Sequence, residues 1–202
     1  MNKPKILAIY GASGHGKVIE DIALLSGYDE CIFIDDGKND HYSFKEYLQT
    51  DYNYPMIIGI GNNKVREQVF NQTRKHKIEL VTLIHPSAVI SKSVKIDEGT
   101  VVMPLVVVNC DTTIGKCVIL NTSCVIEHDN IIKDFVHISP NAALSGNVTV
   151  RRCTQVGIGT SVIQGITIGE NSMVGAGSVV VKNLPSNSLS FGVPARKVRK
   201  YD

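Results

Sequence analysis

The chain has 202 residues, 43% of them hydrophobic, and a formal net charge of +2. This length allows one large domain or two small ones, and the apolar content is enough for a core. The mixed charges argue against a nucleic-acid-binding surface, and the longest apolar run is too short to span a membrane. The chain starts without a signal-peptide pattern, and its five cysteines contain no CxxC pair. We therefore expect reduced thiols in a cytoplasmic protein.

Strand and helix patterns alternate along the first part of the chain. Short apolar strands are predicted at residues 5–10, 31–34, 55–60 and 78–84, and helices at about 17–26, 43–49 and 63–77. The expected apolar faces include Val18 and Leu25 in the first helix and Val65 and Val69 in the last. This alternation predicts a parallel, Rossmann-like sheet in a domain of residues 1–83, with ligands at the carboxyl ends of its strands.

A glycine-rich turn, Gly11-Ala-Ser-Gly-His-Gly16, follows the first strand, and Asp35-Asp36 follows the second. Glycines let a backbone approach phosphate, and a helix N-terminus favours negative charge. An acidic residue after the second strand is typical of ribose binding in dinucleotide-binding proteins. The spacing nevertheless differs from G-x-G-x-x-G, and the domain is too short for a full dinucleotide-binding fold. Three interpretations stay open: a structural turn, a nucleotide or nucleotide-sugar site, and NAD(P) binding.

From Ile84 onward an aliphatic residue recurs at every sixth position, and the residue two before it tends to be small or β-branched. The aliphatic positions are Ile84, Ile90, Ile96, Val102, Val108, Ile114, Leu120, Ile126, Ile132, Ile138, Leu144, Val150, Val156, Val162, Ile168, Val174 and Val180. This period matches neither a helix nor a simple strand. It indicates a parallel β-helix of triangular coils, in which each coil buries its inner face by stacking. Residues 84–202 are expected to form this second domain, with coils up to about Val181 and a short basic tail after them.

One hexad of the repeat concentrates polar groups. Glu127, His128 and Asp129 follow Ile126, and an imidazole with a pKa near neutrality suits a general base. A carboxylate could raise its basicity, and the sequence leaves Glu127 and Asp129 as alternatives. Residues eighteen apart stack in such coils, so Gly146 is expected to leave room for substrate above His128.

His137 lies half a coil away from His128, so the two histidines are expected on different parts of the perimeter. They could converge only between subunits of an oligomer. A zinc site would need a third ligand near these two spaced histidines, so no metal is expected. An exposed His128 without a function is the remaining alternative.

Several motifs together resemble those of one family. They are Gly11-Ala-Ser-Gly-His-Gly16, Asp35-Asp36, Ile60-Gly-Asn-Asn63, Asn121-Thr-Ser, Ile126-Glu-His128 and Gly192-Val-Pro-Ala195. The chain is similar over its whole length to the left-handed β-helix (hexapeptide-repeat) sugar acetyltransferases, in particular to bacterial UDP-4-amino-sugar N-acetyltransferases of the bacillosamine pathway. The left hand of the coil is implied by this resemblance, since the usual crossover preference favours the right hand.

The resemblance also implies roles for individual residues. His128 matches the general base, Asp129 the acid that increases its basicity, and Asn121 a residue near the amino sugar; close relatives often carry Glu where this chain has Asp129. Acetyl-CoA is expected at His137, Gly146, Ile158 and Ala176. The nucleotide sugar is expected at Ser13, Gly14, His15, Asp35, Asp36 and Gly61. A homotrimer with acetyl-CoA between adjacent β-helices follows from the same likeness.

The expected reaction is direct transfer of acetyl from acetyl-CoA to the 4-amino group of a UDP-4-amino-4,6-dideoxy-N-acetyl sugar. Cys124 occupies a small, inward hexad position, so we expect it to pack rather than carry an acyl group. Two alternatives within the enzymes are O-acetylation of a sialic acid and N-acetylation of a GDP-perosamine-type sugar. An alternative of another class is an NAD(P)-binding regulatory protein whose coils serve only for assembly.

Overall fold

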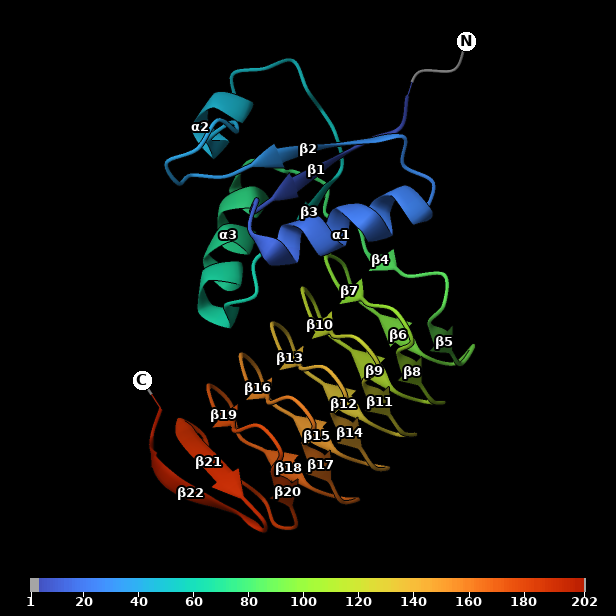
Figure 1. Ribbon diagram of the computed structural model, residues 1–202, viewed down its shortest axis with the longest axis vertical. Coiled ribbons are helices and arrows are strands. Elements are labelled where there is room, and N and C mark those ends of the chain that lie inside the picture. The colour runs from blue at the N-terminus through green and yellow to red at the C-terminus, as the bar shows by residue number, and fades with distance from the viewer. Residues whose placement is uncertain (1–3, 202) are drawn as a thin grey trace.

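The computed structural model describes residues 4–201 and shows a small α/β domain on one end of a long triangular β-helix (Figure 1). The N-terminal sheet has the parallel order β2-β1-β3. Its strands are β1 (Ile6–Tyr10), β2 (Glu30–Ile34) and β3 (Met56–Ile58), and its helices are α1 (Gly14–Leu25), α2 (Phe44–Tyr47) and α3 (Asn63–Lys75). This architecture confirms the predicted Rossmann-like character of the N-terminal part.

The central strand β1 contributes to two cores because its side chains alternate across the sheet. Leu7 and Ile9 pack in one cluster with Ile19 and Ile22 of α1. Ala8 and Tyr10 pack in the other, which also holds residues of α2 and α3. The sheet is therefore covered on both faces, as a parallel sheet requires.

The predicted strand at residues 78–84 does not form as one element. Leu80 makes only an isolated bridge to Met56, and β4 (Leu83–Ile84) pairs instead with the coil strand β7 (Val101–Val102). Three of the expected helix positions are also corrected, since Val18 is 40%, Leu25 61% and Val65 41% exposed. All three lie at a helix periphery, where periodicity alone does not show which side chains a neighbouring layer covers.

The β-helix consists of two-residue strands that alternate among three faces. Face 1 contains β4, β7, β10 (Ile119–Leu120), β13 (His137–Ile138), β16 (Gln155–Val156) and β19 (Met173–Val174). Face 2 contains β5 (Val89–Ile90), β8 (Val107–Val108), β11 (Val125–Ile126), β14 (Ala143–Leu144), β17 (Ser161–Val162) and β20 (Val179–Val180). Face 3 contains β6 (Lys95–Ile96), β9 (Thr113–Ile114), β12 (Ile131–Ile132), β15 (Thr149–Val150) and β18 (Thr167–Ile168).

Residues eighteen apart pair in parallel along each face, for example Ile119 with His137. The six-residue period therefore predicted the coil correctly, and the aliphatic positions from Val102 to Val180 are buried. The first positions are less covered, with Ile84 40% exposed, because no coil precedes them. The small residues two places earlier are buried as well, among them Thr100, Thr112, Cys124, Ala142, Thr154, Thr160, Ser172 and Ser178.

Each corner of the coil turns through a residue of positive φ, which recurs with the same six-residue period. Left-handed backbone favours Asn, Asp and Gly, and Asp111, Asp129 and Asn147 stand at three successive such positions of one column. Asp129 has φ +60°. This turn conformation takes Asp129 out of the strand geometry, in which neighbouring side chains point to opposite sides.

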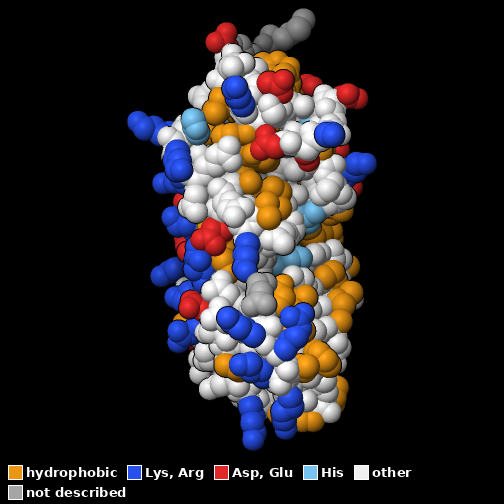
Figure 2. Space-filling model, turned by 90° about the vertical axis from the view of Figure 1, so that its left-hand side faces the viewer, with side chains coloured by type: hydrophobic (Ala, Val, Ile, Leu, Met, Phe, Trp, Pro, Cys, Tyr) orange, Lys and Arg blue, Asp and Glu red, His pale blue; other side chains and the backbone are white. Residues whose placement is uncertain are grey.

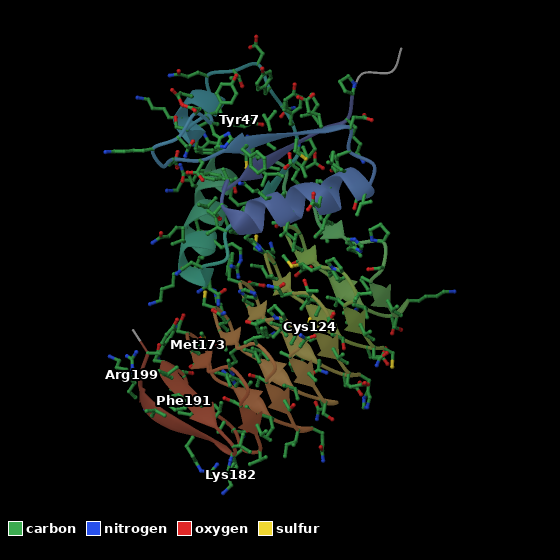
Figure 3. All side chains as sticks on the ribbon, viewed as in Figure 1. Tyr47, Cys124, Met173, Lys182, Phe191 and Arg199 are labelled. Atoms are coloured by element: carbon green, nitrogen blue, oxygen red, sulfur yellow. The ribbon has the colours of Figure 1, made fainter. Side chains whose placement is uncertain are left out.

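The chain ends in an antiparallel hairpin of β21 (Ser188–Gly192) and β22 (Ala195–Lys200), which extends face 1. Phe191 and Arg199 mark its two strands in Figure 3, while Cys124 lies within the coils. Basic side chains gather around this end of the molecule (Figure 2). Within residues 4–201, no helix is both long and apolar enough to cross a membrane.

Candidate functional site

The largest part of the predicted nucleotide-sugar site is a hollow of about 570 Å³ in the N-terminal domain. It lies at the carboxyl ends of β1, β2 and β3, where ligands of open parallel sheets bind. It brings together Ser13, Asp35, Asp36 and Gly61 of the predicted residues. Its lining is Tyr10, Gly11, Ser13, Asp35, Asp36, Gly37, Ile60, Gly61, Asn62, Val65, Gln68, Val69 and Gln72.

The glycine turn has a structural role as well as an exposed edge. Gly11 has φ +118°, and a Cβ there would lie 2.8 Å from the carbonyl oxygen of Gly59. Gly14, in contrast, has nothing within 4 Å of a Cβ position. Gly11 is thus required for the close approach of β1 and β3, while the space beside Gly14 is open at the start of α1.

The two predicted aspartates hold the wall of this hollow together. Asp35 accepts hydrogen bonds from the backbone N–H of Ala12 (2.9 Å) and of Gly37 (2.8 Å), and these bonds lower the pKa of its carboxyl. Asp36 accepts from the backbone N–H of Phe44 (2.8 Å) and from the hydroxyl of Tyr10. Burial, followed by the bond to Asp36, raises the pKa of Tyr10. Both carboxylates are ordered by protein donors and keep further lone pairs for a ligand.

Three other predicted residues meet where the N-terminal domain contacts face 1. The side-chain nitrogen of Asn121 lies 3.0 Å from His137 Nε2, and its oxygen accepts from the backbone N–H of Thr122 (2.8 Å). Burial, followed by the charge of Arg66, lowers the pKa of His137 to about 3 and that of His15 to about 4. Both rings are therefore neutral near pH 7. The buried atoms His15 Nε2 and His137 Nδ1 have no hydrogen-bond partner among the described residues.

Arg66 of α3, which the sequence did not single out, organises this junction. Its side chain is buried, and among residues 4–201 its guanidinium has no carboxylate partner. It donates to the carbonyl oxygens of Ile60, Gly61, Cys117 and Phe135 and to the side chain of Asn63. Burial lowers its pKa to about 10. In the sequence Arg66 is one charged residue of a polar helix pattern, and periodicity does not distinguish a buried arginine from a solvated one.

The predicted base and its acid partner lie at the corner between faces 2 and 3. His128 Nδ1 is 2.7 Å from Asp129 Oδ2, and this bond is the main reason for the raised pKa of His128. Glu127 instead accepts from the side-chain nitrogen of Asn109 at 2.8 Å. The geometry thus favours Asp129 over Glu127 as the residue that orients the ring. A proton on Nδ1 would be donated to Asp129 and would leave the Nε2 lone pair of the half-exposed ring free.

Asn130 fixes this corner from inside the coil, and the sequence did not assign it that role. It is buried where neighbouring coils carry Thr112 and Val148. Its side chain donates to the carbonyl oxygens of Glu127 and Ser145 and accepts from the backbone N–H of Val148. A polar residue at an inward position of the hexad was the available signal.

The expected room for substrate above His128 is not there, because the ring itself fills it. A Cβ on Gly146 would lie 2.6 Å from His128 Cε1 and 2.8 Å from Nε2. Gly146 is buried and therefore does not itself offer an open surface. Ile158, in contrast, is 51% exposed and Ala176 is exposed, and both stand at the corner between faces 1 and 2, where Asn121 also lies.

Cys124 is fully buried, and burial raises the pKa of its thiol to about 12. Such a thiol is neither exposed nor ionised at neutral pH, so it packs in the coil as predicted. Among the described residues no group of three His, Cys, Asp or Glu side chains is arranged to hold a metal ion.

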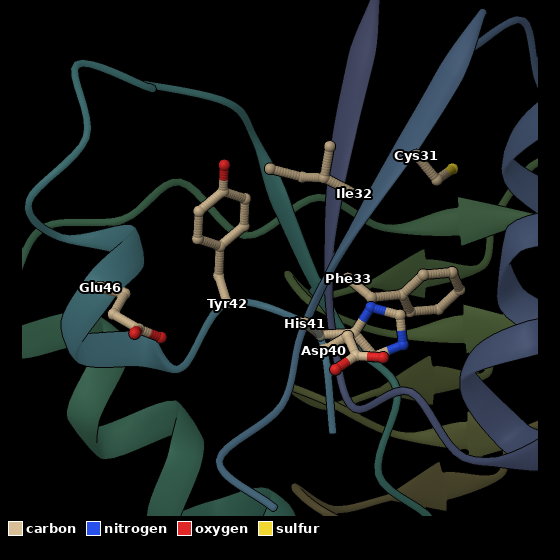
Figure 4. Close-up of a pocket in the computed structure, with 7 residues that line it drawn as sticks. All are labelled: Cys31, Ile32, Phe33, Asp40, His41, Tyr42 and Glu46. Carbon is tan, nitrogen blue, oxygen red and sulfur yellow. The ribbon is translucent and has the colours of Figure 1, made fainter. Parts of the chain in front are cut away.

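A second hollow, which the sequence did not predict, lies beside the edge strand β2 (Figure 4). Its lining is Cys31, Ile32, Phe33, Asp40, His41, Tyr42 and Glu46. It contains none of the predicted site residues.

The outward surfaces of the three faces differ in character. The upper part of face 1 lies against the N-terminal domain, with Val101 and Ile119 buried. Face 3 presents Lys95, Thr113, Ile131, Thr149 and Thr167, which are mostly polar. Face 2 presents Val89, Val107, Val125, Ala143, Ser161 and Val179, and Val89 is 65% exposed. Face 2 is thus an uncovered, mainly apolar strip, bounded by the corner of Asn121 on one side and the corner of His128 on the other.

Comparisons with known proteins define the class. The family model of the PglD N-terminal domain matches residues 6–73. A perosamine N-acetyltransferase variant from Caulobacter crescentus, solved with CoA and GDP-perosamine, superposes with a TM-score of 0.93 at 34% identity, over 96% of this chain and 97% of that one. The acetyltransferase domain of PglB from Neisseria gonorrhoeae FA1090, solved with acetyl coenzyme A, gives 0.91 at 33% identity, over 97% and 100%.

A curated relative, UDP-N-acetylbacillosamine N-acetyltransferase of Bacillus subtilis (strain 168), is 41% identical over 107 residues. That match spans 47% of this chain and half of the relative's length. Together with the two full-length structural matches, it confirms the resemblance found in the sequence. The chain belongs to the family of left-handed β-helix sugar N-acetyltransferases.

Proposed function

We propose that the protein transfers the acetyl group of acetyl-CoA to the 4-amino group of a UDP-4-amino-4,6-dideoxy-N-acetyl sugar, with His128 as general base. The observation that carries this proposal is the 2.7 Å contact between His128 Nδ1 and Asp129 Oδ2 at an exposed corner. A carboxylate on Nδ1 fixes the tautomer and leaves Nε2 free to take a proton. The relatives that bind CoA or acetyl-CoA support the donor.

In the proposed reaction the sugar amine attacks the thioester carbon while His128 Nε2 removes a proton from the attacking nitrogen. A C–N bond forms, and the C–S bond breaks when the tetrahedral intermediate collapses. Backbone N–H groups of the coil would stabilise the oxyanion of that intermediate. CoA leaves as the thiol after it receives a proton, and no acyl-enzyme forms.

The nucleotide sugar is proposed to bind in the N-terminal hollow through the open start of α1 near Ser13, Gly14 and His15, with Asp35, Asp36 and Gly61 opposite. The name of the curated relative supports a UDP sugar. A GDP-perosamine-type sugar is the second candidate, because the Caulobacter crescentus structure contains GDP-perosamine. Acetyl-CoA is proposed to lie along the corner of Asn121, Ile158 and Ala176, with His137 behind it.

The site requires more than one copy of the chain in this proposal. His128 stands at one corner of face 2, and Asn121 stands at the other. If face 2 packs against a neighbouring copy in a closed ring, the His128 corner of one copy meets the Asn121 corner of the next. The exposed apolar side chains of face 2 support this packing, and the family resemblance supports a homotrimer. The free cysteines support a reducing, cytoplasmic location.

The test presents purified protein with acetyl-CoA and a panel of UDP-, GDP- and CMP-sugars, and follows release of free thiol. Release with a UDP-4-amino sugar supports the proposal, and release only with a GDP-4-amino sugar selects the second candidate. His128→Ala should lower turnover by roughly 10²–10⁴-fold, the range for a positioned base. Full turnover in His128→Ala would show that another group removes the proton.

A further inference from the structure

The column of residues at the His128 corner contains one position without a side chain. Positions eighteen apart carry Lys92, Cys110, His128, Gly146 and Gln164. The glycine lies one coil further along and is the direct neighbour of the imidazole. Gly146 has no positive φ, so its backbone conformation does not itself require glycine.

The ring of His128 lies with its face against Gly146. The atoms Cε1, Nε2 and Nδ1 would be 2.6, 2.8 and 3.2 Å from a Cβ on that glycine. Three ring atoms at such similar distances place the face of the ring, rather than one atom, towards the glycine. The plane of the ring, which contains the Nε2 lone pair, therefore runs alongside the coil and towards solvent.

The backbone on both sides of this contact is held by hydrogen bonds between coils. The N–H of Asn147 donates to the carbonyl oxygen of His128 (2.9 Å), and the N–H of Gly165 donates to that of Gly146 (3.0 Å). The N–H of Asp129 donates to the carbonyl oxygen of Cys110 (3.0 Å). Because the strands cannot separate without losing these bonds, any added atom at position 146 must displace the half-exposed ring instead.

We propose that Gly146 is a positioning residue. Because it has no Cβ, the ring of His128 can lie directly against its backbone while Nδ1 bonds Asp129 and Nε2 faces the substrate. This inference rests on the proposed function of His128 and assigns to Gly146 a role distinct from contact with acetyl-CoA. An alanine methyl at 2.6 Å would be 0.8 Å inside the ordinary contact limit of 3.4 Å. The ring would turn away and leave Asp129.

The effect on catalysis should exceed the effect on stability. A displacement of about 1 Å of a catalytic group costs up to 10²-fold in rate, whereas an exposed ring can turn into solvent with little loss of packing. In Gly146→Ala we expect kcat to fall by roughly 10²-fold, with the KM for acetyl-CoA unchanged and the midpoint of thermal unfolding close to that of the wild type.

A second readout does not depend on activity. In wild-type protein the bond to Asp129 raises the pKa of His128, while Glu127 is the other charged group acting on the ring. The packed coils contribute Cys110 on one side and the uncharged Gly146 and Asn147 on the other. Titration of the Cε1–H signal of His128 by NMR, assigned by its loss in His128→Ala, should give a lower pKa in Gly146→Ala than in the wild type.

The matched control is Gly115→Ala, at the corner between faces 3 and 1. A Cβ there would lie 2.8 Å from the backbone nitrogen of Asp134, so the substitution would strain the coil at a corner that His128 does not occupy. This control should lower the unfolding temperature but leave the His128 titration and the pH profile unchanged.

A raised KM for acetyl-CoA at unchanged kcat in Gly146→Ala would overturn the proposal in favour of a cofactor contact. An unchanged His128 titration would overturn it as well. Absence of acetyl transfer by the wild type would instead contradict the proposed function, and the NMR titration would still decide whether Gly146 positions the ring of His128.

Discussion

Arg66 Nη2 donates to the carbonyl oxygen of Phe135 at 2.9 Å and so joins a helix of the N-terminal domain to the β-helix. The same guanidinium donates to the carbonyl oxygens of Ile60 and Gly61 in the wall of the hollow proposed to bind the nucleotide sugar. One buried side chain therefore fixes the position of the hollow relative to face 1. Polar groups of the N-terminal domain and of the β-helix therefore gather around this side chain at the junction of the two domains.

Replacing Arg66 by Met should destabilise the protein strongly. The substitution leaves several buried carbonyl oxygens without donors, and each unsatisfied group costs about 1–3 kcal/mol. We expect the free energy of unfolding to fall by roughly 3 kcal/mol or more, measured by urea denaturation. Arg74→Met is the control, because the exposed pair of Arg74 with Glu98 contributes at most about 1 kcal/mol. Equal losses in the two variants would contradict the role of Arg66.

Replacing Asp129 by Asn should change the pH dependence of turnover. His128 acts as a base only when deprotonated, so kcat/KM rises with pH through the pKa of His128 in the free enzyme. The side-chain bond to Asp129 raises that pKa, so its loss should move the acidic limb to lower pH. The maximal rate should fall by roughly 10²-fold because the ring is no longer oriented.

Glu127→Gln is the control for this prediction, since Glu127 bonds Asn109 and not the ring. Its acidic limb should move less than that of Asp129→Asn. A larger shift in Glu127→Gln would show that Glu127, and not Asp129, is the partner of His128.

The repeat of six could be predicted from the sequence because each aliphatic residue has the same environment in every coil, and stacking requires no long-range information. The pairing of His128 with Asp129 was open, because it depends on the left-handed turn at Asp129, which hydrophobic periodicity does not show. Residues 78–84 were predicted to form one strand of the N-terminal sheet, whereas β4 at their end pairs with β7 of the β-helix. A short apolar segment can pair with either sheet, and periodicity does not decide between them. Arg66 was missed because two of its acceptors, the carbonyl oxygens of Cys117 and Phe135, are far away in the chain.

Gly146 shows a further limit of sequence reasoning. The stacking rule placed Gly146 correctly next to His128. The prediction was wrong about what fills the space beside Gly146, which is the ring of His128 and not a substrate. Only the orientation of the ring, held by Asp129, shows that the imidazole lies over the glycine.

The two buried histidines at the junction should make folding sensitive to mild acid. Their pKa values are about 4 for His15 and about 3 for His137, against about 6.5 in an unfolded chain. Between pH 6.5 and 4 the unfolded chain therefore binds more protons, and stability falls as pH decreases. Above pH 6.5 both states are neutral, and this contribution is constant.

Each of these histidines should add up to about 1.4 kcal/mol per pH unit to the slope of unfolding free energy in that window. His15→Gln and His137→Gln should each flatten the slope, as measured by urea denaturation at a series of pH values. The exposed His76→Gln is the control and should keep the wild-type slope. A slope that is unchanged in both buried variants would mean that water already reaches and protonates these rings.

A charge on face 2 should dissociate the proposed trimer. Val125 lies in the middle of the uncovered apolar strip, next to the corner of His128, and Val125→Lys would place an ammonium group in the interface, where a buried unpaired charge is strongly unfavourable. We expect sedimentation to shift from a trimer to a monomer and turnover to fall with it, because His128 then loses the Asn121 corner of its neighbour. Thr113→Lys, on the polar face 3, should keep both the wild-type mass and the wild-type turnover. If the wild type itself sediments as an active monomer, the site is complete within one chain and the intersubunit arrangement is wrong.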